Sequence, residues 1–287
     1  MLRALWVVLP FTVGAEIGDA LHRHSPAVRT TASVEAWALW AVVLVATLVP
    51  HPIGLTTLRC VAPAMTVVAV AALSAGRPGA VVGALGTGGA VVATVVAFLP
   101  TTGTWAVNGP AYPNERRFPL AVPGPLLLGP VIVAWAAVTG LPVAASLLLA
   151  SRQWVAGGGA AALAVGAVIV GGRALHQLSR RWIVFVPAGL VLHDPMSVAD
   201  PVLFRRQVVE GLGPAPTASD SLDLTQRAAG LALELRLTEK VPLARITAAS
   251  RRGEQGASAR LLFTPTRPGA VLAEASARSI RVAAGTP

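Results

Sequence analysis

Cysteine, lysine and tyrosine are almost absent from this chain, and charge of either sign is scarce. Cys60 is the only cysteine in 287 residues, which excludes a secreted scaffold held by disulfides and a zinc site built on thiolates. Charged side chains make up 13% of the residues, whereas a soluble protein averages about 25%. The chain therefore lacks the polar surface that a soluble enzyme of this length would need.

A basic cluster of the kind that binds nucleic acid is also missing. The formal net charge is +10, yet the chain contains a single lysine, Lys240. Nucleic-acid-binding domains gather their cations on one face or along one arm, but these arginines are scattered between apolar segments and loops. We therefore exclude nucleic acid as a partner and attribute the positive charge to membrane topology and to attraction toward anionic lipids.

Apolar residues, in contrast, are abundant and unevenly distributed. They make up 54% of the chain, and the mean hydropathy is +0.66. The first 172 residues hold eight cations and four acids, whereas the remaining 115 hold fifteen cations and nine acids. This division predicts a membrane region followed by a soluble one. The predicted parts are a transmembrane helical bundle at 1–175, a membrane-exit segment at 176–181, a β-rich domain with a C-terminal helix at 182–281, and a frayed tail at 282–287.

Six segments are long and apolar enough to be membrane spans, which need about 20 mostly apolar residues. We interpret the first as an uncleaved span, because Glu16 and Asp19 stand where a signal peptide would require its cleavage site. The fifth is over-long and contains Gly140-Leu-Pro142, so it is either kinked there or includes a re-entrant turn. The six segments are 4–21, 35–50, 53–75, 79–99, 122–150 and 155–175.

The distribution of arginines between the loops predicts the orientation. Six spans place both ends of the chain on one side, and the side with more cations faces the cytoplasm. Arg3, Arg59, Arg116, Arg117, Arg173, Arg180 and Arg181 would be inside, and Arg23, Arg29, Arg77 and Arg152 outside. We expect a multi-pass plasma-membrane protein with a cytoplasmic C-terminal domain. The Pro-, Asn- and Gly-rich loop at 105–112 would also suit the outside, so a count of five spans stays open.

The soluble part has the sequence pattern of β-strands. Segments 182–186 and 190–193 flank Pro187-Ala-Gly189, which is typical of a hairpin. Leucines at alternate positions of 231–238 indicate a strand with one buried face. We further expect strands at 242–248 and 259–264, a flexible connection at 211–220, and a helix from Pro268 to about residue 280. The predicted fold class is a membrane α-helical bundle of about six helices followed by a small α+β domain, mainly of antiparallel β-strands.

This order of elements, with the hairpin at 183–193 and the helix beginning at Pro268, resembles the bacterial pleckstrin-homology-like (PH-like) domains attached to membrane proteins. The resemblance covers residues 182–281 and implies a PH-like fold for them. The stretches at 108–119 and 180–194 make the chain similar to uncharacterised integral membrane proteins of high-GC actinobacteria. Neither resemblance implies an activity.

Two carboxylates interrupt the first span. Glu16 and Asp19 are three residues apart and share one face of a helix, and His22 continues that face one turn on. Ionisable groups inside a span would suit a proton or cation relay. Alternatively, this turn lies at the headgroup boundary, where the carboxylates are solvated or pair with Arg23 or Arg59. We expect no metal site.

Other residues are candidates for packing or for contacts outside the bundle. Gly79, Gly83 and Thr87 recur every four residues in the fourth span, which allows close helix packing within the bundle or against a partner. The loop candidates are Tyr112, Glu115, Arg116 and Arg117, which would bind an anionic headgroup or a partner, or only form an interfacial loop. The lipid-headgroup candidates are Arg180, Arg181, Trp182, Arg205 and Arg206.

Catalytic patterns are missing from the soluble part. It contains no nucleophile elbow, P-loop or dinucleotide-binding glycine pattern, and we interpret His193 and Asp194 as the residues that end the hairpin. We expect no cofactor and a non-enzymatic scaffold, assembly or regulatory subunit that presents the β-domain for protein or lipid contacts. Its partner would be another membrane protein or a second copy. The alternative is a small ion- or proton-coupled transporter component that uses Glu16 and Asp19.

Overall fold

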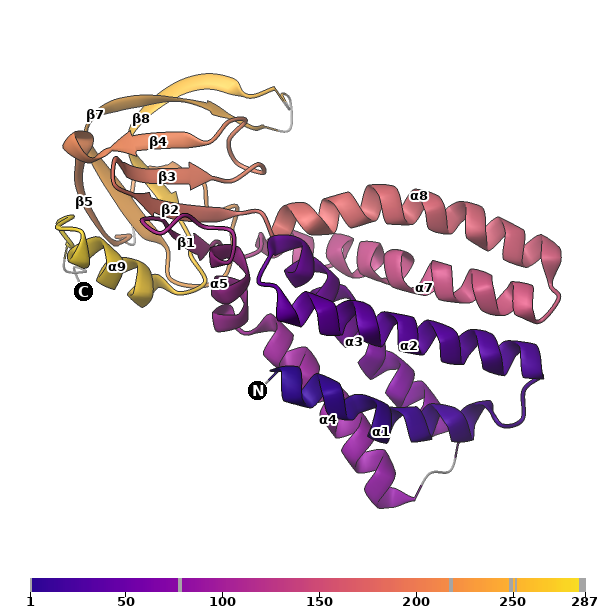
Figure 1. Cartoon of the computed structure of the whole chain (residues 1–287). Coiled ribbons are helices and arrows are strands. Elements are labelled where there is room, and N and C mark those ends of the chain that lie inside the picture. Colours follow the sequence, from indigo (N-terminus) through magenta and orange to yellow (C-terminus); the bar gives the residue numbers. More distant parts are fainter. Residues whose placement is uncertain (1, 77–78, 217–218, 248–249, 251, 284–287) are drawn as a thin grey trace. The chain divides into compact units, whose positions relative to one another are not determined.

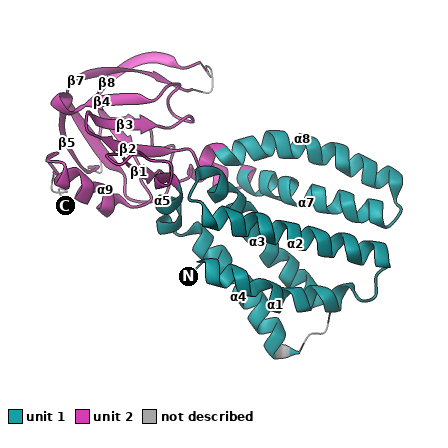
Figure 2. Ribbon diagram, viewed as in Figure 1, with its two compact units in different colours: residues 1–106, 131–176 teal, residues 107–130, 177–287 magenta. Residues whose placement is uncertain are grey.

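The protein divides into two compact units, and neither is a single stretch of chain. The structure, a computed structural model, describes residues 2–76, 79–216, 219–247, 250 and 252–283. Residues 1–106 and 131–176 form a helical unit, and residues 107–130 and 177–287 form a β unit (Figure 2). The segment 107–130 was expected to belong to the membrane bundle, and in this respect the expected boundaries differ from the structure.

Six helices long and apolar enough to cross a membrane make up most of the helical unit (Figure 1). The expected helical bundle followed by a small β domain is therefore confirmed. The six are α1 (Leu2–Leu21), α2 (Pro26–Leu48), α3 (Pro52–Ala75), α4 (Ala80–Phe98), α7 (Pro130–Ala150) and α8 (Trp154–Leu178). Two shorter helices, α5 (Pro100–Asn108) and α6 (Gly124–Leu127), lie between α4 and α7.

Local sequence signals decide where these helices begin. The hydroxyl of Ser25 accepts a hydrogen bond from the backbone N–H of Val28, and Pro26 occupies the first turn of α2. Ser and Pro at these positions are typical of helix N-termini. The second span therefore starts nine residues before the expected position 35. The fifth span begins at Pro130 instead of 122 and continues through Pro142, because α6 and a turn occupy residues 124–129.

Helices α1 to α4 share one apolar core. It includes Trp6, Leu9 and Val13 of α1, together with small residues of α4 such as Ala90 and Ala93. The indoles of Trp6 and Trp40 each donate a hydrogen bond to the backbone carbonyl of the other, at 2.9 and 2.8 Å. This pair joins α1 to α2 and satisfies two N–H groups that would be costly to leave unpaired in hydrocarbon.

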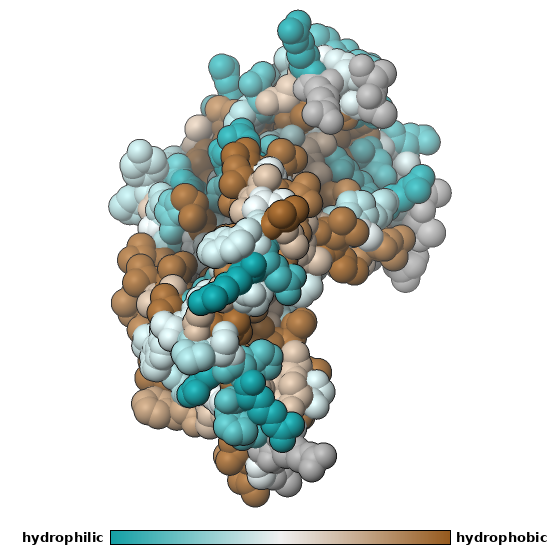
Figure 3. Space-filling view, turned by 90° about the vertical axis from the view of Figure 1, so that its right-hand side faces the viewer, coloured by the Kyte–Doolittle hydropathy of each residue, from teal (hydrophilic) through white to brown (hydrophobic). Residues whose placement is uncertain are grey.

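The α7–α8 pair is attached to this core by few polar contacts. Trp135 of α7 donates to the carbonyl of Cys60 at 2.9 Å, and His176 of α8 hydrogen-bonds the Thr56 hydroxyl at 2.9 Å. The buried share of the apolar window is 6% in α7 and 11% in α8, against 33% in α3. A space-filling view shows apolar side chains reaching the surface in many places (Figure 3). Lipid or a partner must cover most of this surface.

The β unit contains two four-stranded sheets and one C-terminal helix. The first sheet has the order β1-β2-β3-β4, with antiparallel neighbours. The second has the order β5-β7-β8-β6, in which β6 is parallel to β8 and the other neighbours are antiparallel. The elements are β1 (Arg116–Pro119), β2 (Trp182–Val186), β3 (Gly189–His193), β4 (Val202–Arg205), the 3-10 turn η1 (Arg206–Val208), β5 (Val209–Pro214), β6 (Leu222–Asp223), β7 (Leu233–Arg245), β8 (Glu254–Phe263) and α9 (Pro268–Ala277).

The hairpin expected at 182–193 is confirmed, and its turn requires glycine. Gly189 has φ +144°, and a Cβ there would overlap the backbone of Phe204 and Arg206. Apolar side chains of both sheets and α9 then form one core. Its members include Phe118, Ile183, Phe185, Leu190, Phe204, Leu212, Leu233, Leu235, Leu261, Phe263, Val271 and Ala275.

Four expectations for the β unit are corrected. The strands expected at 231–238 and 242–248 are one strand, β7, with an irregular register between Arg236 and Val241. Residues 211–214 of the expected flexible connection belong to β5. Helix α9 starts at Pro268 as expected but ends at Ala277. Strands β1, β4, β5 and β6 were not expected at all. Of the tail expected at 282–287, residues 284–287 lie outside the described part.

Candidate functional site

Three side chains from three neighbouring strands form a stack on the first sheet of the β unit. The rings of Trp182 (β2) and His193 (β3) are directly paired in register and stack with centroids 4.9 Å apart. The guanidinium carbon of Arg117 (β1) lies 5.6 Å from the centroid of the Trp182 ring. Trp182 thus connects a cation to an imidazole, and cation–aromatic contacts of this kind are worth about 0.5–2 kcal/mol. We call these three residues the Arg–Trp–His stack.

The stack retains unused hydrogen-bonding capacity. Arg117 pairs with Glu115 at 3.0 Å, but its Nε is buried and has no partner among the described residues. The Nε2 of His193 is also buried and without a partner there. Burial lowers the pKa of His193, the positive charges of Arg180 and Arg117 lower it further, and Asp194 acts in the opposite direction. Burial and the two arginines therefore favour the neutral form of His193.

Asn108 holds the strand that carries Arg117. Its side-chain oxygen accepts from the Arg117 backbone N–H at 2.9 Å, and its amide donates to the Arg117 carbonyl at 2.7 Å. The amide therefore occupies the outer edge of β1 as another strand would, and this leaves no open pairing edge at Arg117. No local sequence pattern predicts this contact, because Asn108 ends α5 and Arg117 lies in β1 nine residues later.

Arg181 is not free to bind a lipid headgroup, which corrects one expectation. Its side chain is 2% exposed and makes two hydrogen bonds to Asp194, at 2.7 and 2.8 Å. A third bond joins it to the carbonyl of Ala121 at 2.8 Å. Asp194 also accepts from Ser197 at 2.7 Å. Arg181 and Asp194 therefore form a buried structural pair that links the two chain segments of the β unit.

The remaining headgroup candidates separate into two groups. Arg180, which is exposed, precedes Trp182 at the start of β2. Arg205 and Arg206, also exposed, lie beside the β2–β3 turn, because Gly189 pairs with Arg205. These two ends of the hairpin are about 13 Å apart along the strand, so they do not form one headgroup site. Among the loop candidates, Tyr112 and Arg116 are exposed.

In the helical unit, the three relay candidates lie in different surroundings. Glu16 is fully buried, with 0% exposure, and lies against Gly86 and Thr87 of α4. Asp19 is exposed near the end of α1 and lies beside Gly76. His22 follows the helix end at Leu21, so it does not continue the helical face as expected. The described residues include no ion pair between Glu16 and Arg23 or Arg59.

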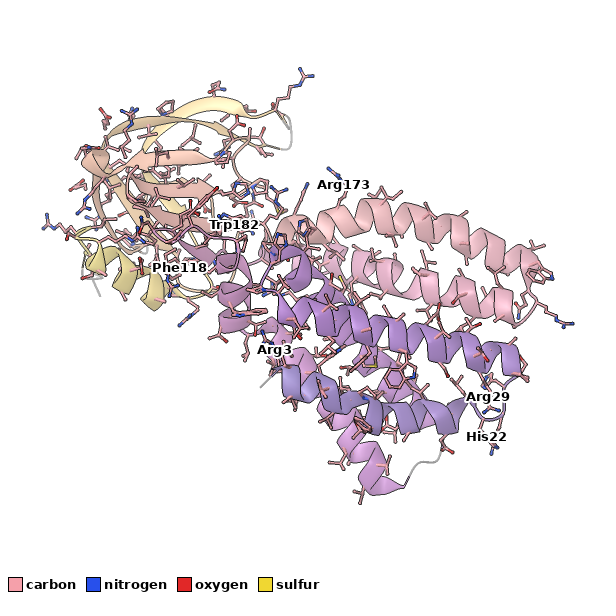
Figure 4. The ribbon with its side chains drawn as sticks, in the orientation of Figure 1. Arg3, His22, Arg29, Phe118, Arg173 and Trp182 are labelled. Atoms are coloured by element: carbon pink, nitrogen blue, oxygen red, sulfur yellow. The ribbon has the colours of Figure 1, made fainter. Side chains whose placement is uncertain are left out.

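The charged residues of the helical unit keep the predicted separation between its two ends. Arg3 and Arg173 lie at one end of the bundle, whereas His22 and Arg29 lie at the other (Figure 4). Glu35 is a further acid within an apolar helix, and it is the first residue of the span expected at 35–50. The cap at Ser25 puts it nine residues inside α2 and half-buried, about 13 Å from the helix start.

The described ranges contain no group of three or more His, Cys, Asp or Glu side chains that could hold a metal ion. Comparisons of the chain with protein-family models, with curated proteins and with solved structures find no match. Function is therefore inferred from geometry.

Proposed function

We propose that this chain is a non-enzymatic scaffold or regulatory subunit of the plasma membrane, whose β unit contacts a partner protein at the inner face of an anionic bilayer. The observation that carries the proposal is the insertion of β1 from the segment between two spans. The chain passes between the units three times, after residues 106, 130 and 176. A domain joined by three connections has far less freedom to leave the membrane surface than one on a single linker.

Positions near the bilayer follow from chain length. Arg180 is two residues and Trp182 four residues past the end of α8 at Leu178, so at most about 7 and 14 Å separate them from the helix end. The headgroup layer is roughly 5–8 Å thick on each side. Arg180 can therefore reach lipid phosphates, and Trp182 would serve as an interfacial anchor where the chain between Leu178 and Trp182 is not fully extended.

The inward orientation rests on the arginine distribution in the sequence, which assigns seven cations to the side of the β unit and four to the other. One of the seven, Arg59, lies within α3. We further propose that the β unit is a PH-like domain of the actinobacterial type. Its two sheets followed by a terminal helix support this, although β1 comes from an earlier part of the chain.

Photo-cross-linking in the native membrane tests the partner contact. A photoreactive amino acid replaces Tyr112, which is 74% exposed, in the full-length chain. Arg260, exposed on β8, serves as the matched control position. We expect one discrete protein adduct from position 112, weakened by Arg116→Glu, and none from position 260. Recovery of the chain without an adduct would contradict the scaffold proposal.

Hydrogen exchange in nanodiscs tests the lipid contact separately. We expect the segment around Arg180 and Trp182 to exchange more slowly in discs that contain anionic phospholipid than in zwitterionic discs. Arg180→Gln should remove this difference, and Arg260→Gln should leave it. Equal exchange of the wild-type segment in both kinds of disc would show that the β unit does not contact headgroups there.

A further inference from the structure

The contact between α1 and α4 contains an acid where the surrounding pattern calls for an apolar residue. The buried positions of α1 are Trp6, Leu9, Val13 and Glu16, spaced by three and four residues. This spacing is that of a helix face packed against a neighbour. Glu16 thus continues an apolar stripe with a carboxyl group, and its 0% exposure removes it from water and from any partner of the chain.

Small residues of α4 make room for this carboxyl. A Cβ at position 86 would overlap the Glu16 side chain, so Gly86 is required for the approach. Neither carboxyl oxygen has a hydrogen-bond partner among the described residues. The backbone of Thr87 is a polar neighbour of the carboxyl group. The Thr87 hydroxyl is also buried without a partner there. Glu16 and Thr87 thus each carry a buried polar side chain without a partner among the described residues.

Among the described residues, no cation of the packed helices forms an ion pair with Glu16. Helix α4 contains no ionisable residue. The only charged residue of α3 is Arg59, which donates to the carbonyl of Ala97. Ala97 is eleven residues from Gly86 on α4, about 16 Å along the axis. Helix α2 contributes Arg29 and Glu35, and α1 contributes Arg3 near its opposite end and Asp19 one turn beyond Glu16.

Glu16 lies close to one end of α1, and therefore close to one face of the membrane. It lies five residues before the end of α1 at Leu21, about 7.5 Å along the helix axis. Asp19, which is exposed, occupies the same side of the helix one turn closer to that end. A second acid, exposed in the structure, therefore stands between Glu16 and that end of the helix.

We propose that Glu16, together with Gly86 and Thr87, forms a proton-exchange site inside the helical unit, loaded from the Asp19 end of α1. An isolated carboxylate in hydrocarbon is costly, whereas the neutral acid carries no charge and offers one O–H donor beside Thr87. Loading transfers one proton from hydronium to a Glu16 oxygen and releases water, and unloading reverses this. The site is independent of the proposed scaffold role.

Labelling with dicyclohexylcarbodiimide tests the site, because this apolar reagent modifies protonated carboxyls within membranes. The full-length chain is labelled in liposomes and the modified residue is identified by mass spectrometry. We expect an adduct at Glu16, its loss in Glu16→Gln, and a labelling rate that falls as the pH at the Asp19 face is raised. Above the midpoint, the fall should be about tenfold per pH unit.

A matched pair of glycine variants controls for non-specific labelling. Gly86→Ala places a methyl group against the carboxyl and should displace it, whereas Gly88→Ala meets open space on the same helix. We expect the first to change the rate at Glu16 and the second to leave it unchanged. Asp19→Asn should slow the response to a pH jump. An unlabelled Glu16 in the wild-type chain, or equal rates in the two glycine variants, would overturn the proposal.

Discussion

At the scale of single residues, the buried pair Arg181–Asp194 connects the two chain segments of the β unit. We expect Asp194→Asn to lower the free energy of unfolding by about 3–5 kcal/mol, because it leaves the guanidinium of Arg181 buried without its counter-charge. Asp200→Asn, at an exposed position, is the control and should have little effect. Urea unfolding of the detergent-solubilised full chain measures the difference, and equal midpoints for the two variants would contradict a structural role for the pair.

The depressed pKa of His193 makes the stability of the β unit depend on pH. Its pKa in the folded chain lies below the ordinary value of 6.5, so the unfolded chain binds its proton first as the pH falls. Stability is then lost between pH 6.5 and the folded pKa, by at most about 1.4 kcal/mol per pH unit. Unfolding curves of wild type and His193→Phe should diverge in this window. His24→Gln, at an exposed position, should follow the wild type.

Glu16 and Asp19 show that residue spacing predicts which helix face a side chain occupies but not whether that side chain is buried. Spacing correctly placed Glu16 and Asp19 on one helix side, since i and i+3 always share a face. Spacing could not show that Glu16 alone is buried, because that depends on the glycine opposite it on α4. The structural role of Arg181 could not be predicted either, because its partner Asp194 is thirteen residues away. The residues next to Arg181 would look the same if its side chain were exposed.

At the scale of elements, β1 is one of the four strands, with β4, β5 and β6, that the sequence pattern did not predict. It has four residues and follows a turn-rich loop, so it offers too few positions for an alternating pattern. Its partner β2 is 63 residues later in the chain. The longer elements were predictable because helical apolar runs and alternating leucines extend over many positions.

Strand β1 contributes to the core through Phe118, which is 5% exposed and contacts the ring of Phe185 edge-on at 5.7 Å. We expect Phe118→Ala to destabilise the β unit by about 3–5 kcal/mol, through lost burial and the cavity that remains. Tyr112→Ala, four residues upstream of β1 and 74% exposed, should change stability little. Thermal unfolding in detergent compares the variants. If both variants unfold at the wild-type temperature, β1 is not part of the β unit core.

At the scale of the whole molecule, composition predicted two parts but not that the second is discontinuous. The division into an apolar first part and a polar second part placed the boundary close to residue 176, where the last crossing occurs. Composition does not reveal that the segment 107–130 belongs to the β unit, because a short segment between two spans hardly changes the average hydropathy and charge of the first part.

The discontinuity predicts the behaviour of isolated pieces. A fragment of residues 182–287 lacks Phe118 and Leu120 from the core and Arg181 from its pair with Asp194. We expect it to bind hydrophobic dyes and to lack near-UV circular dichroism, as partly folded chains do. A chain that joins residues 107–123 through a Gly/Ser linker to residues 177–283 should instead unfold cooperatively. Cooperative unfolding of the shorter fragment alone would contradict this account.

The insertion of β1 also has a consequence for biosynthesis. The ribosome releases β1 more than 60 residues before β2, and α7 and α8 must enter the membrane as a pair in the interval. If only one of them is inserted, β1 and β2 emerge on opposite sides of the bilayer and cannot pair. Completion of the first sheet therefore requires that α7 and α8 are not inserted singly, and a chain with only one of them inserted is left with β2 lacking its partner strand β1.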